Sequence, residues 1–428
     1  MRDVMSLRLC SLLALMVTLV MGVSGCGGRA VGPLPVQSRP AVTAPVAQPV
    51  PPQVPAPAPA PAPVPAPAPA PAPAPSAQAT PPTAPGSQYR VALLVPLTGS
   101  SAAIGEALLN SAQLALFETA DNNFILQSYD TQGKPDVAAA VAATDIQQGA
   151  QLIIGPVFSP EVKAVAPVAA AAYVNVIAFS TDPGAAGHGV YIMGFLLRHQ
   201  VQRVATFAHQ HGLSRFAALA PANDYGRAVV LALREAVTAF GGVVLDIEYY
   251  DPAGVEQIQS VQRLARLKDQ VDAVLIPDRG VRLKQVANLL PYLNMDLRKV
   301  RLLGTQLWDE PGLGSERVLV GGWYAAPFNP WQKQFAVRYR QSFGTQAPPN
   351  SSLAYDAIAL AATLARAPGG TTFDAAVLTT PSGFNGVDGL FRFRPDGTVE
   401  RSLAVLEVTP NGINEVSPAP TTFAQPLY

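Results

Sequence analysis

The sequence YRVALLVPLTG at residues 89–99 begins the part of the chain whose pattern determines the fold. It is a short apolar run ended by Pro96 and Gly99, which is typical of a strand buried on both faces of a parallel sheet. The segment that follows, at residues 102–120, carries apolar residues at helical spacing. A buried strand followed directly by a helix predicts an α/β protein.

This alternation of strand and helix continues along the chain. Seven more apolar runs are predicted as strands, at residues 123–130, 151–156, 175–181, 215–221, 241–250, 271–277 and 300–305. Helical segments lie between them, and a turn-rich stretch at residues 181–189 separates an earlier set of strands from a later set. Two successive sets predict two parallel sheets, each flanked by helices on both faces.

The composition excludes some classes of function. The 428 residues include 29 basic and 29 acidic side chains, and this balance argues against a nucleic-acid partner, which usually requires an excess of positive charge. The two cysteines, Cys10 and Cys26, both precede residue 30. Residues 89–428 therefore contain neither an internal disulfide nor a thiolate metal site.

The N-terminus has the pattern of a secretory signal. Arg2 and Arg8 precede an uncharged run at residues 10–25, as a positive n-region precedes an h-region. The sequence VSGC at residues 23–26 resembles the bacterial lipobox, in which an apolar residue and two small residues precede an obligatory cysteine. The run is also long enough to be considered as a membrane-spanning helix, but the lipobox favours cleavage.

We therefore predict a lipoprotein signal peptide at residues 1–25 and lipidation of Cys26, which becomes the first residue of the mature chain. Two or more acyl chains make a stable membrane anchor, whereas one gives only marginal binding. Gly27 and Gly28 follow the cysteine, where lipoproteins retained at the inner membrane carry Asp. The resemblance to lipoproteins thus implies the outer membrane, with the protein on its periplasmic face.

Residues 26–88 are predicted to be a disordered linker rich in Pro and Ala. Proline fixes φ and removes backbone donors, so the alternating tract at residues 50–75 favours polyproline II over helix or sheet. At roughly 3.1 Å per residue this tract spans about 80 Å. A semi-rigid spacer is the simplest interpretation, and a P-x-x-P ligand for another domain is the alternative.

Four stretches in the same order carry a resemblance to a known family. They are residues 91–116, 153–181, 219–226 and 384–401. Together they resemble the type I periplasmic-binding fold of the leucine/isoleucine/valine-binding proteins. The resemblance implies a two-lobed α/β domain at residues 89–428. Its first lobe would comprise about 89–195 plus about 306–390, and its second about 196–305 plus the C-terminal segment.

Two further stretches resemble one group within this family, the penicillin-binding protein activators. These are LIPDRG at residues 275–280 and LLGTQLWDEPGL at residues 302–313. The resemblance implies a domain with no chemistry of its own, whose partner is a peptidoglycan synthase, a class A penicillin-binding protein.

The same resemblance implies ligand-binding positions between the lobes. In the amino-acid receptors, a serine after a GP turn and a Ser/Thr pair after the fourth strand bind the ligand carboxylate, and Ser159, Ser180 and Thr181 match them. A tyrosine of the second lobe closes over the ligand, and Tyr225 matches it. Each residue also has a purely structural interpretation: Ser159 as a helix cap, Ser180 and Thr181 as turn residues, and Tyr225 as packing between lobes.

The position that holds the ligand ammonium group departs from the receptor pattern. The matching loop has no acid at its centre, residues 252–254, although Asp251 and Glu256 flank it. Because a buried ammonium without a paired charge is costly, an amino-acid ligand is doubtful, and a small polar ligand is left open.

No constellation in the sequence predicts catalysis. There is no G-x-S-x-G elbow, and Ser159 and Lys163 are four residues apart, whereas an S-x-x-K pair needs three. His209 and His211 form an H-x-H with no third ligand nearby. We therefore predict no catalytic residue, no metal and no cofactor.

Three functions remain in competition. The first is a lipid-anchored regulatory protein that activates a class A penicillin-binding protein by contact. The second is a substrate-binding receptor for an amino-acid-type ABC transporter, although an outer-membrane tether would hold it away from an inner-membrane permease. An enzyme acting on the cell wall is the weakest of the three, because no catalytic constellation supports it.

Overall fold

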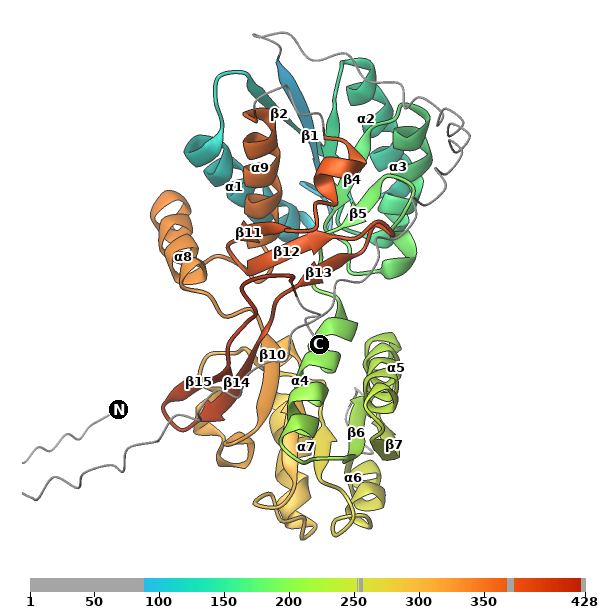
Figure 1. The fold of residues 1–428 in the computed structure, drawn as a ribbon, viewed down its shortest axis with the longest axis vertical. Helices are drawn as coiled ribbons and strands as arrows, with labels where there is room; N and C mark the ends of the chain where they lie inside the picture. The colour runs from blue at the N-terminus through green and yellow to red at the C-terminus, as the bar shows by residue number, and fades with distance from the viewer. Residues whose placement is uncertain (1–87, 252, 254–256, 368–372, 425–428) are drawn as a thin grey trace, which may run out of the picture. The chain divides into compact units, whose positions relative to one another are not determined.

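The computed structural model describes most of the chain after the predicted linker. The described residues are 88–251, 253, 257–367 and 373–424. The predicted signal peptide, Cys26 and the linker up to residue 87 lie outside them. The described part has the predicted two-lobed α/β architecture, with a sheet flanked by helices in each lobe (Figure 1). The sheet is parallel in the first lobe and mostly parallel in the second.

The first lobe is built on a five-stranded parallel sheet with the order β2-β1-β3-β4-β5. Its strands are β1 (Tyr89–Val95), β2 (Phe124–Asp130), β3 (Leu152–Ile154), β4 (Asn175–Ala178) and β5 (Val190–Ile192). The stretch that predicted the fold forms the interior strand β1, where Leu93 lies opposite Ser128 of β2 and Ile154 of β3. Leu93 is fully buried, as the continuous apolar pattern predicted.

Helices cover both faces of this sheet, with α1 and α9 on one side and α2 and α3 on the other (Figure 1). The helices of the lobe are α1 (Ala102–Thr119), α2 (Pro135–Gln147), α3 (Ser159–Ala171), α8 (Pro330–Phe343), α9 (Ser352–Ala365) and the short α10 (Ala375–Leu378). Small buried residues of α9, Ala354, Ala357 and Ala361, allow it to pack closely in the core.

A second, antiparallel sheet of three strands completes the first lobe. Its strands are β11 (Phe384–Gly386), β12 (Gly389–Phe393) and β13 (Val399–Arg401), in the order β11-β12-β13. Phe391, Phe393 and Val399 join the same apolar core as the five-stranded sheet, so this small sheet belongs to the first lobe.

The second lobe contains a seven-stranded sheet with the order β15-β14-β10-β9-β8-β6-β7. Its strands are β6 (Arg215–Pro221), β7 (Val243–Tyr250), β8 (Ala273–Leu275), β9 (Arg301–Gly304), β10 (Trp323–Ala326), β14 (Ala404–Thr409) and β15 (Gly412–Ser417). Its helices are α4 (Leu197–Gln210), α5 (Asp224–Ala239), α6 (Gln257–Ala265) and α7 (Gly280–Tyr292). Strands β14 and β15 are antiparallel to their neighbours, and the others are parallel.

Short 3-10 turns complete the described secondary structure. They are η1 (Pro183–Ala185), η2 (Gln306–Trp308), η3 (Leu313–Ser315) and η4 (Arg317–Leu319).

The structure places two lobe boundaries later than the sequence suggested. The chain does not leave the second lobe at about residue 305, because β10 pairs with β9 on one side and with β14 on the other. Likewise, β12 and β13 extend the first lobe beyond residue 390 to Arg401. The two lobes are therefore connected at residues 193–196, 327–329 and 402–403.

One glycine has the same role in each lobe. A Cβ added to Gly105 in α1 would lie 1.9 Å from the carbonyl oxygen of Pro96, and one added to Gly226 in α5 would lie 2.0 Å from that of Pro221. Both distances are far below van der Waals contact, so only glycine lets each helix start pack directly onto the end of the preceding strand. The two lobes therefore use the same strand-to-helix geometry at the edge where their loops gather.

Candidate functional site

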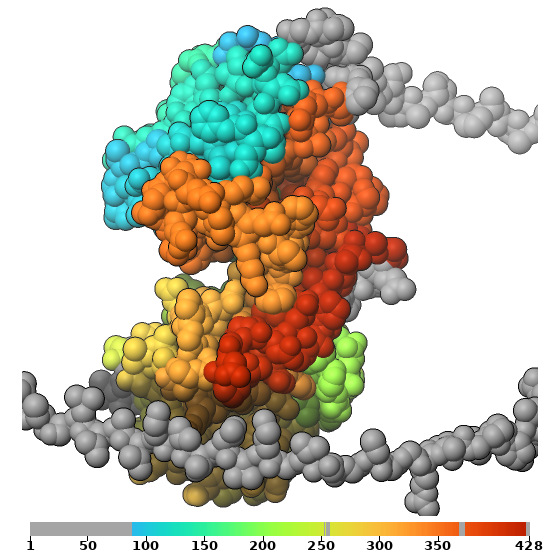
Figure 2. Space-filling model, turned by 90° about the vertical axis from the view of Figure 1, so that its left-hand side faces the viewer, coloured from blue at the N-terminus to red at the C-terminus, as the bar shows by residue number. Residues whose placement is uncertain are grey.

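Residues of both lobes line a cleft of about 540 Å³. The first lobe contributes Thr181, Gln332 and Asp388, and the second contributes Tyr225, Arg279 and Glu310, among others. Figure 2 shows a hollow below the orange segment that contains α8. A concave site with a few polar groups between two lobes is a common place for a small ligand.

Ser159 does not serve as the N-cap that one interpretation predicted, because α3 begins at Ser159 and Phe158 is its cap residue. The hydroxyl of Ser159 instead donates a hydrogen bond to Oδ2 of Asp182. The Nζ of Lys163 lies 2.9 Å from the same oxygen. The Ser159 hydroxyl therefore donates its hydrogen bond to a carboxylate of the protein itself.

The remaining contacts of Asp182 fix it in this position. Its Oδ1 accepts a hydrogen bond from the N–H of Gly184 at 2.8 Å, at the start of the η1 turn. The hydrogen bonds from Ser159 and Lys163 hold the pKa of Asp182 below its usual range, because both favour the ionised form. The group that Ser159 binds is thus an anion at neutral pH.

Ser180 has the turn role that the sequence allowed. It is buried, and its Oγ accepts a hydrogen bond from the backbone N–H of Asp182 at 3.1 Å. Thr181 is exposed and lines the cleft. Of this predicted pair, only Thr181 faces the space where a ligand would lie.

Tyr225 lines the cleft from the second lobe. Its hydroxyl and the Oγ1 of Thr305 are 2.8 Å apart, and Thr305 is fully buried. Burial raises the pKa of Tyr225 to about 12, so the phenol stays neutral. Because Thr305 belongs to the same lobe, this hydrogen bond holds the tyrosine against its own lobe.

Asp251 does not reach the cleft. It is exposed after β7, and its Oδ1 accepts a hydrogen bond from the N–H of Ala253 at 2.8 Å. Glu256, the other flanking acid, lies outside the described residues. Among the five predicted ligand-binding residues, the cleft thus brings together Thr181 and Tyr225, whereas Ser159, Ser180 and Asp251 are not in its described lining.

The cleft also contains acids that the sequence reasoning did not assign to it. Asp388 is buried and accepts hydrogen bonds from Nε2 of Gln332 at 2.9 Å and from Oγ of Ser352 at 2.7 Å. Glu310 accepts a hydrogen bond from the N–H of Gly280 at 3.0 Å. Both acids stand in stretches that carried the family resemblance, but only their three-dimensional neighbours show that they face the cleft.

The two histidines considered as metal ligands have ordinary packing partners. The ring of His209 stacks on Phe240, with centroids 4.4 Å apart, and Nδ1 of His211 lies 2.8 Å from the carbonyl oxygen of Phe207. No group of three His, Cys, Asp or Glu side chains suited to a metal occurs among the described residues. Within the same residues, no helix combines the length and the apolar character needed to cross a bilayer.

The two-lobed geometry agrees with a comparison against known families. The family described as periplasmic binding protein matches residues 88–413. The chain belongs to the periplasmic binding protein family. Among solved periplasmic binding proteins, a putative branched-chain amino acid ABC transporter from Rhodospirillum rubrum superposes with a TM-score of 0.68 at 18% identity. It covers 77% of this chain and 100% of that one, a likeness that shows the fold alone.

Two curated proteins resemble this periplasmic binding protein in sequence. "Uncharacterized protein RP748" from Rickettsia prowazekii is 21% identical over 236 residues, which cover 55% of this chain and 60% of the relative. "Penicillin-binding protein activator LpoA" from Glaesserella parasuis is 29% identical over 164 residues, which cover 38% of this chain and 28% of the relative. Each match thus spans less than two thirds of the relative's own length. The predicted leucine-binding-protein-like fold is confirmed.

Proposed function

We propose that this chain is a lipid-anchored periplasmic regulatory protein that activates a class A penicillin-binding protein by contact. The observation that carries the proposal is the bond between Ser159 and Asp182, because an internal carboxylate stands where a receptor would hold its ligand's carboxylate. The 29% identity to a penicillin-binding protein activator supports the same function.

An amino-acid ligand would have to displace Asp182 from Ser159 and Lys163. The hydroxyl of Ser159 and the ammonium of Lys163 would then bind the ligand's carboxylate in place of that of Asp182. Such an exchange adds little binding energy, and it leaves the Asp182 carboxylate without these two donors. Asp251, which flanks the loop expected to bind the ammonium group, is directed to its own backbone turn. These contacts favour a binding domain whose ligand is another protein.

The anchor and the linker form part of the proposal. Lipidation of Cys26 would fix the chain to the outer membrane, and the Pro/Ala tract of about 80 Å would carry the domain toward an enzyme of the inner membrane. A regulator of this kind acts by binding the active state of its partner more tightly than the inactive state.

The proposal is tested by adding the full-length chain to a purified class A penicillin-binding protein and measuring glycan polymerisation. We expect a higher rate, together with a chemical crosslink between the two proteins. Cys26→Ser is the matched control, because it should keep the stimulation in solution and lose function in cells, where the anchor is needed. An unchanged rate with no crosslink would refute the proposal.

A second candidate function is a receptor for an ABC transporter. It is favoured by the cleft of about 540 Å³, into which Thr181 and Tyr225 face. A receptor should bind a small polar ligand tightly and gain thermal stability from it. Two results together would favour the receptor function over the activator function. Thr181→Val and Tyr225→Phe would each weaken the binding of the small ligand, and adding the protein would not change the rate of the synthase.

A further inference from the structure

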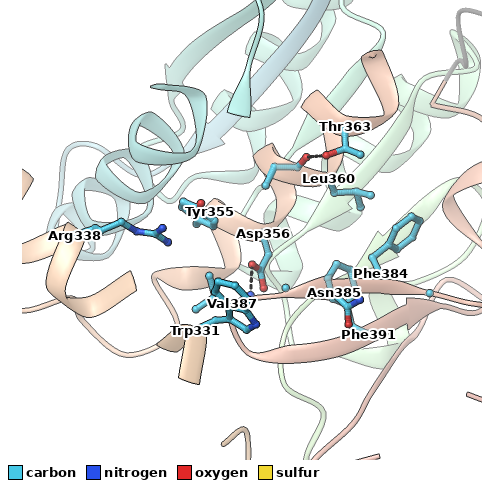
Figure 3. A pocket seen from close by; sticks show the side chains of 13 residues that line it. Trp331, Arg338, Tyr355, Asp356, Leu360, Thr363, Phe384, Asn385, Val387 and Phe391 are labelled. Atoms are coloured by element: carbon cyan, nitrogen blue, oxygen red, sulfur yellow. Dashed lines mark hydrogen bonds between the residues drawn. The ribbon is translucent and has the colours of Figure 1, made fainter. Parts of the chain in front are cut away.

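A second pocket, of about 760 Å³, lies in the first lobe and borders the cleft at Val387, which lines both (Figure 3). It is bounded by α8, α9 and the β11–β12 hairpin. Four aromatic rings line it: Trp331, Tyr355, Phe384 and Phe391. Aromatic faces attract cations as well as apolar groups, so the walls suit a ligand that combines both characters.

One carboxylate in the wall of this pocket is only partly satisfied. Asp356 is 4% exposed, and its Oδ1 accepts a hydrogen bond from the N–H of Val387 at 2.7 Å. Its Oδ2 is buried and has no hydrogen-bond partner among the described residues. A Cβ on Gly386 would lie 2.3 Å from Oδ2, so the glycine at this point of the hairpin makes room for the carboxylate. A buried acceptor left without a donor is costly, and a ligand that donates to it recovers that cost.

Two other charged groups act on Asp356. Asp388 and Arg401 both lie close enough to do so, and the cluster thus contains two acids and one arginine. Arg401 also donates to the carbonyl oxygen of Met193 at 2.8 Å. On the opposite wall, the Nε of Arg338 lies 3.4 Å from Glu118, so that cation has its own counter-charge.

The titration of Asp356 reflects the same surroundings. Burial, and after it the nearby Asp388 carboxylate, raise the pKa of Asp356 to about 7. The N–H of Val387 and the guanidinium of Arg401 oppose the rise. Tyr355, the adjacent residue, donates its hydroxyl to Glu118 at 2.6 Å and remains neutral.

We propose that this pocket binds a primary ammonium group carried on an apolar stem, as in a lysine side chain, with the ammonium on Asp356 and the stem between the aromatic walls. The ammonium supplies the donor and the positive charge that Oδ2 lacks. The four rings cover the methylene groups of the stem and add cation–π attraction. This site borders the cleft at Val387 but does not depend on the function proposed above.

The probe for this site is Nα-acetyl-lysine methylamide, titrated into the full-length chain. Trp331 is 56% exposed and lines the pocket, whereas Trp308 and Trp323 are buried, so a change in tryptophan fluorescence reports binding there. The uncharged analogue Nα-acetyl-norleucine methylamide has the same stem. We expect the lysine probe to bind at least about tenfold more tightly, and equal binding of the two probes would overturn the proposal.

The pH dependence of binding tests the role of Asp356 directly. The probe's amine stays protonated below about pH 9, so only the carboxylate titrates near neutrality. The affinity should rise about tenfold per pH unit below pH 7 and become constant above it. A dissociation constant that does not change between pH 5.5 and 8 would refute the assignment.

Asp356→Asn should weaken binding at pH 8 by about tenfold or more and remove the pH dependence. Asp121→Asn, in the exposed turn before β2, is the matched control. It should change neither the affinity for the lysine probe nor the pH dependence of that affinity. If Asp356→Asn does not fold, Phe384→Leu keeps an apolar wall and removes one ring, so it should weaken the lysine probe more than the norleucine analogue. Wild-type binding by both variants would contradict the proposal.

Two sources of the ammonium group are separated by a third titration, with 1,5-diaminopentane. If this free amine binds as tightly as the lysine probe, the pocket recognises a small amine. If only the lysine probe saturates the site, the ammonium belongs to a peptide or protein. If neither probe binds more tightly to wild type than to Asp356→Asn, the pocket has no such role.

Discussion

The hydroxyl of Ser159 donates to the carboxylate of Asp182, two residues that are 23 positions apart in the sequence. This bond gives Ser159 a role that differs from both of those the sequence offered, the helix cap and the ligand contact. Lys163 reinforces it from the next turn of α3. At the start of α3, Ser159 and Lys163 therefore both contact a carboxylate of their own lobe.

The first prediction concerns the removal of this internal carboxylate. Asp182→Ala should leave Ser159 and Lys163 free to bind a carboxylate from solution, so acetate or leucine at millimolar concentration should raise the melting temperature of the variant and not that of wild type. The stability lost in the variant should be small, at most about 1 kcal/mol, since the ion pair is partly exposed.

A matched control for this experiment is Asp224→Ala, which removes an exposed ion pair with Arg227 at the start of α5. Its response to acetate should equal that of wild type. An identical response of the Asp182 and Asp224 variants would show that Ser159 and Lys163 do not form a latent anion site.

The second prediction concerns the pH dependence of stability. The pKa of Asp356 is raised in the folded protein to about 7, against about 3.9 when unfolded, so the folded state holds a proton that the unfolded state releases. This contribution to the free energy of unfolding is present below pH 4 and is lost as the pH rises to 7. Its size is on the order of a few kcal/mol, because each unit of difference between the folded and unfolded pKa contributes about 1.4 kcal/mol.

Urea unfolding of wild type and Asp356→Asn at several pH values measures this effect. The stability of wild type relative to the variant should fall between pH 4 and 7 and stay constant above pH 8. Parallel curves across that range would mean that Asp356 does not titrate as its burial implies.

The sequence predicted the architecture more fully than the site, for a physical reason. Continuous apolar runs such as β1 and β6 mark buried strands wherever they occur, because their pattern is local. The pairing of β10 (Trp323–Ala326) with β14 spans about eighty positions, so no local pattern predicted it. The bond from Ser159 to Asp182 and the approach of Asp356 to Val387 also depend on folded contacts that residue types alone do not specify.

The third prediction concerns Arg401, which is 2% exposed. Its guanidinium acts on both Asp356 and Asp388 and also binds the carbonyl oxygen of Met193, where the chain passes between lobes. Arg401→Met should destabilise the protein by about 3–5 kcal/mol at pH 8, because it leaves two buried acids without their cation. Chemical denaturation measures the loss.

A second substitution separates the electrostatic part of that loss from the packing part. In the Arg401→Met background, Asp356→Asn removes one of the two acids and should recover a measurable fraction of the stability at pH 8. Strictly additive effects of the two substitutions would contradict an interaction between Arg401 and Asp356.

The last prediction concerns the hydrogen bond between Tyr225 and Thr305 in the second lobe. Tyr225→Phe should lower the free energy of unfolding by about 1 kcal/mol, the usual value of one such bond. Thr305→Val should cost more, because it leaves the Tyr225 hydroxyl without its partner and removes an acceptor for the N–H of Leu307. Tyr173→Phe is the control, since Tyr173 is 96% exposed and should lose almost nothing. Urea unfolding checks all three, and equal losses for Tyr225→Phe and Tyr173→Phe would show that the bond does not hold the tyrosine against its lobe.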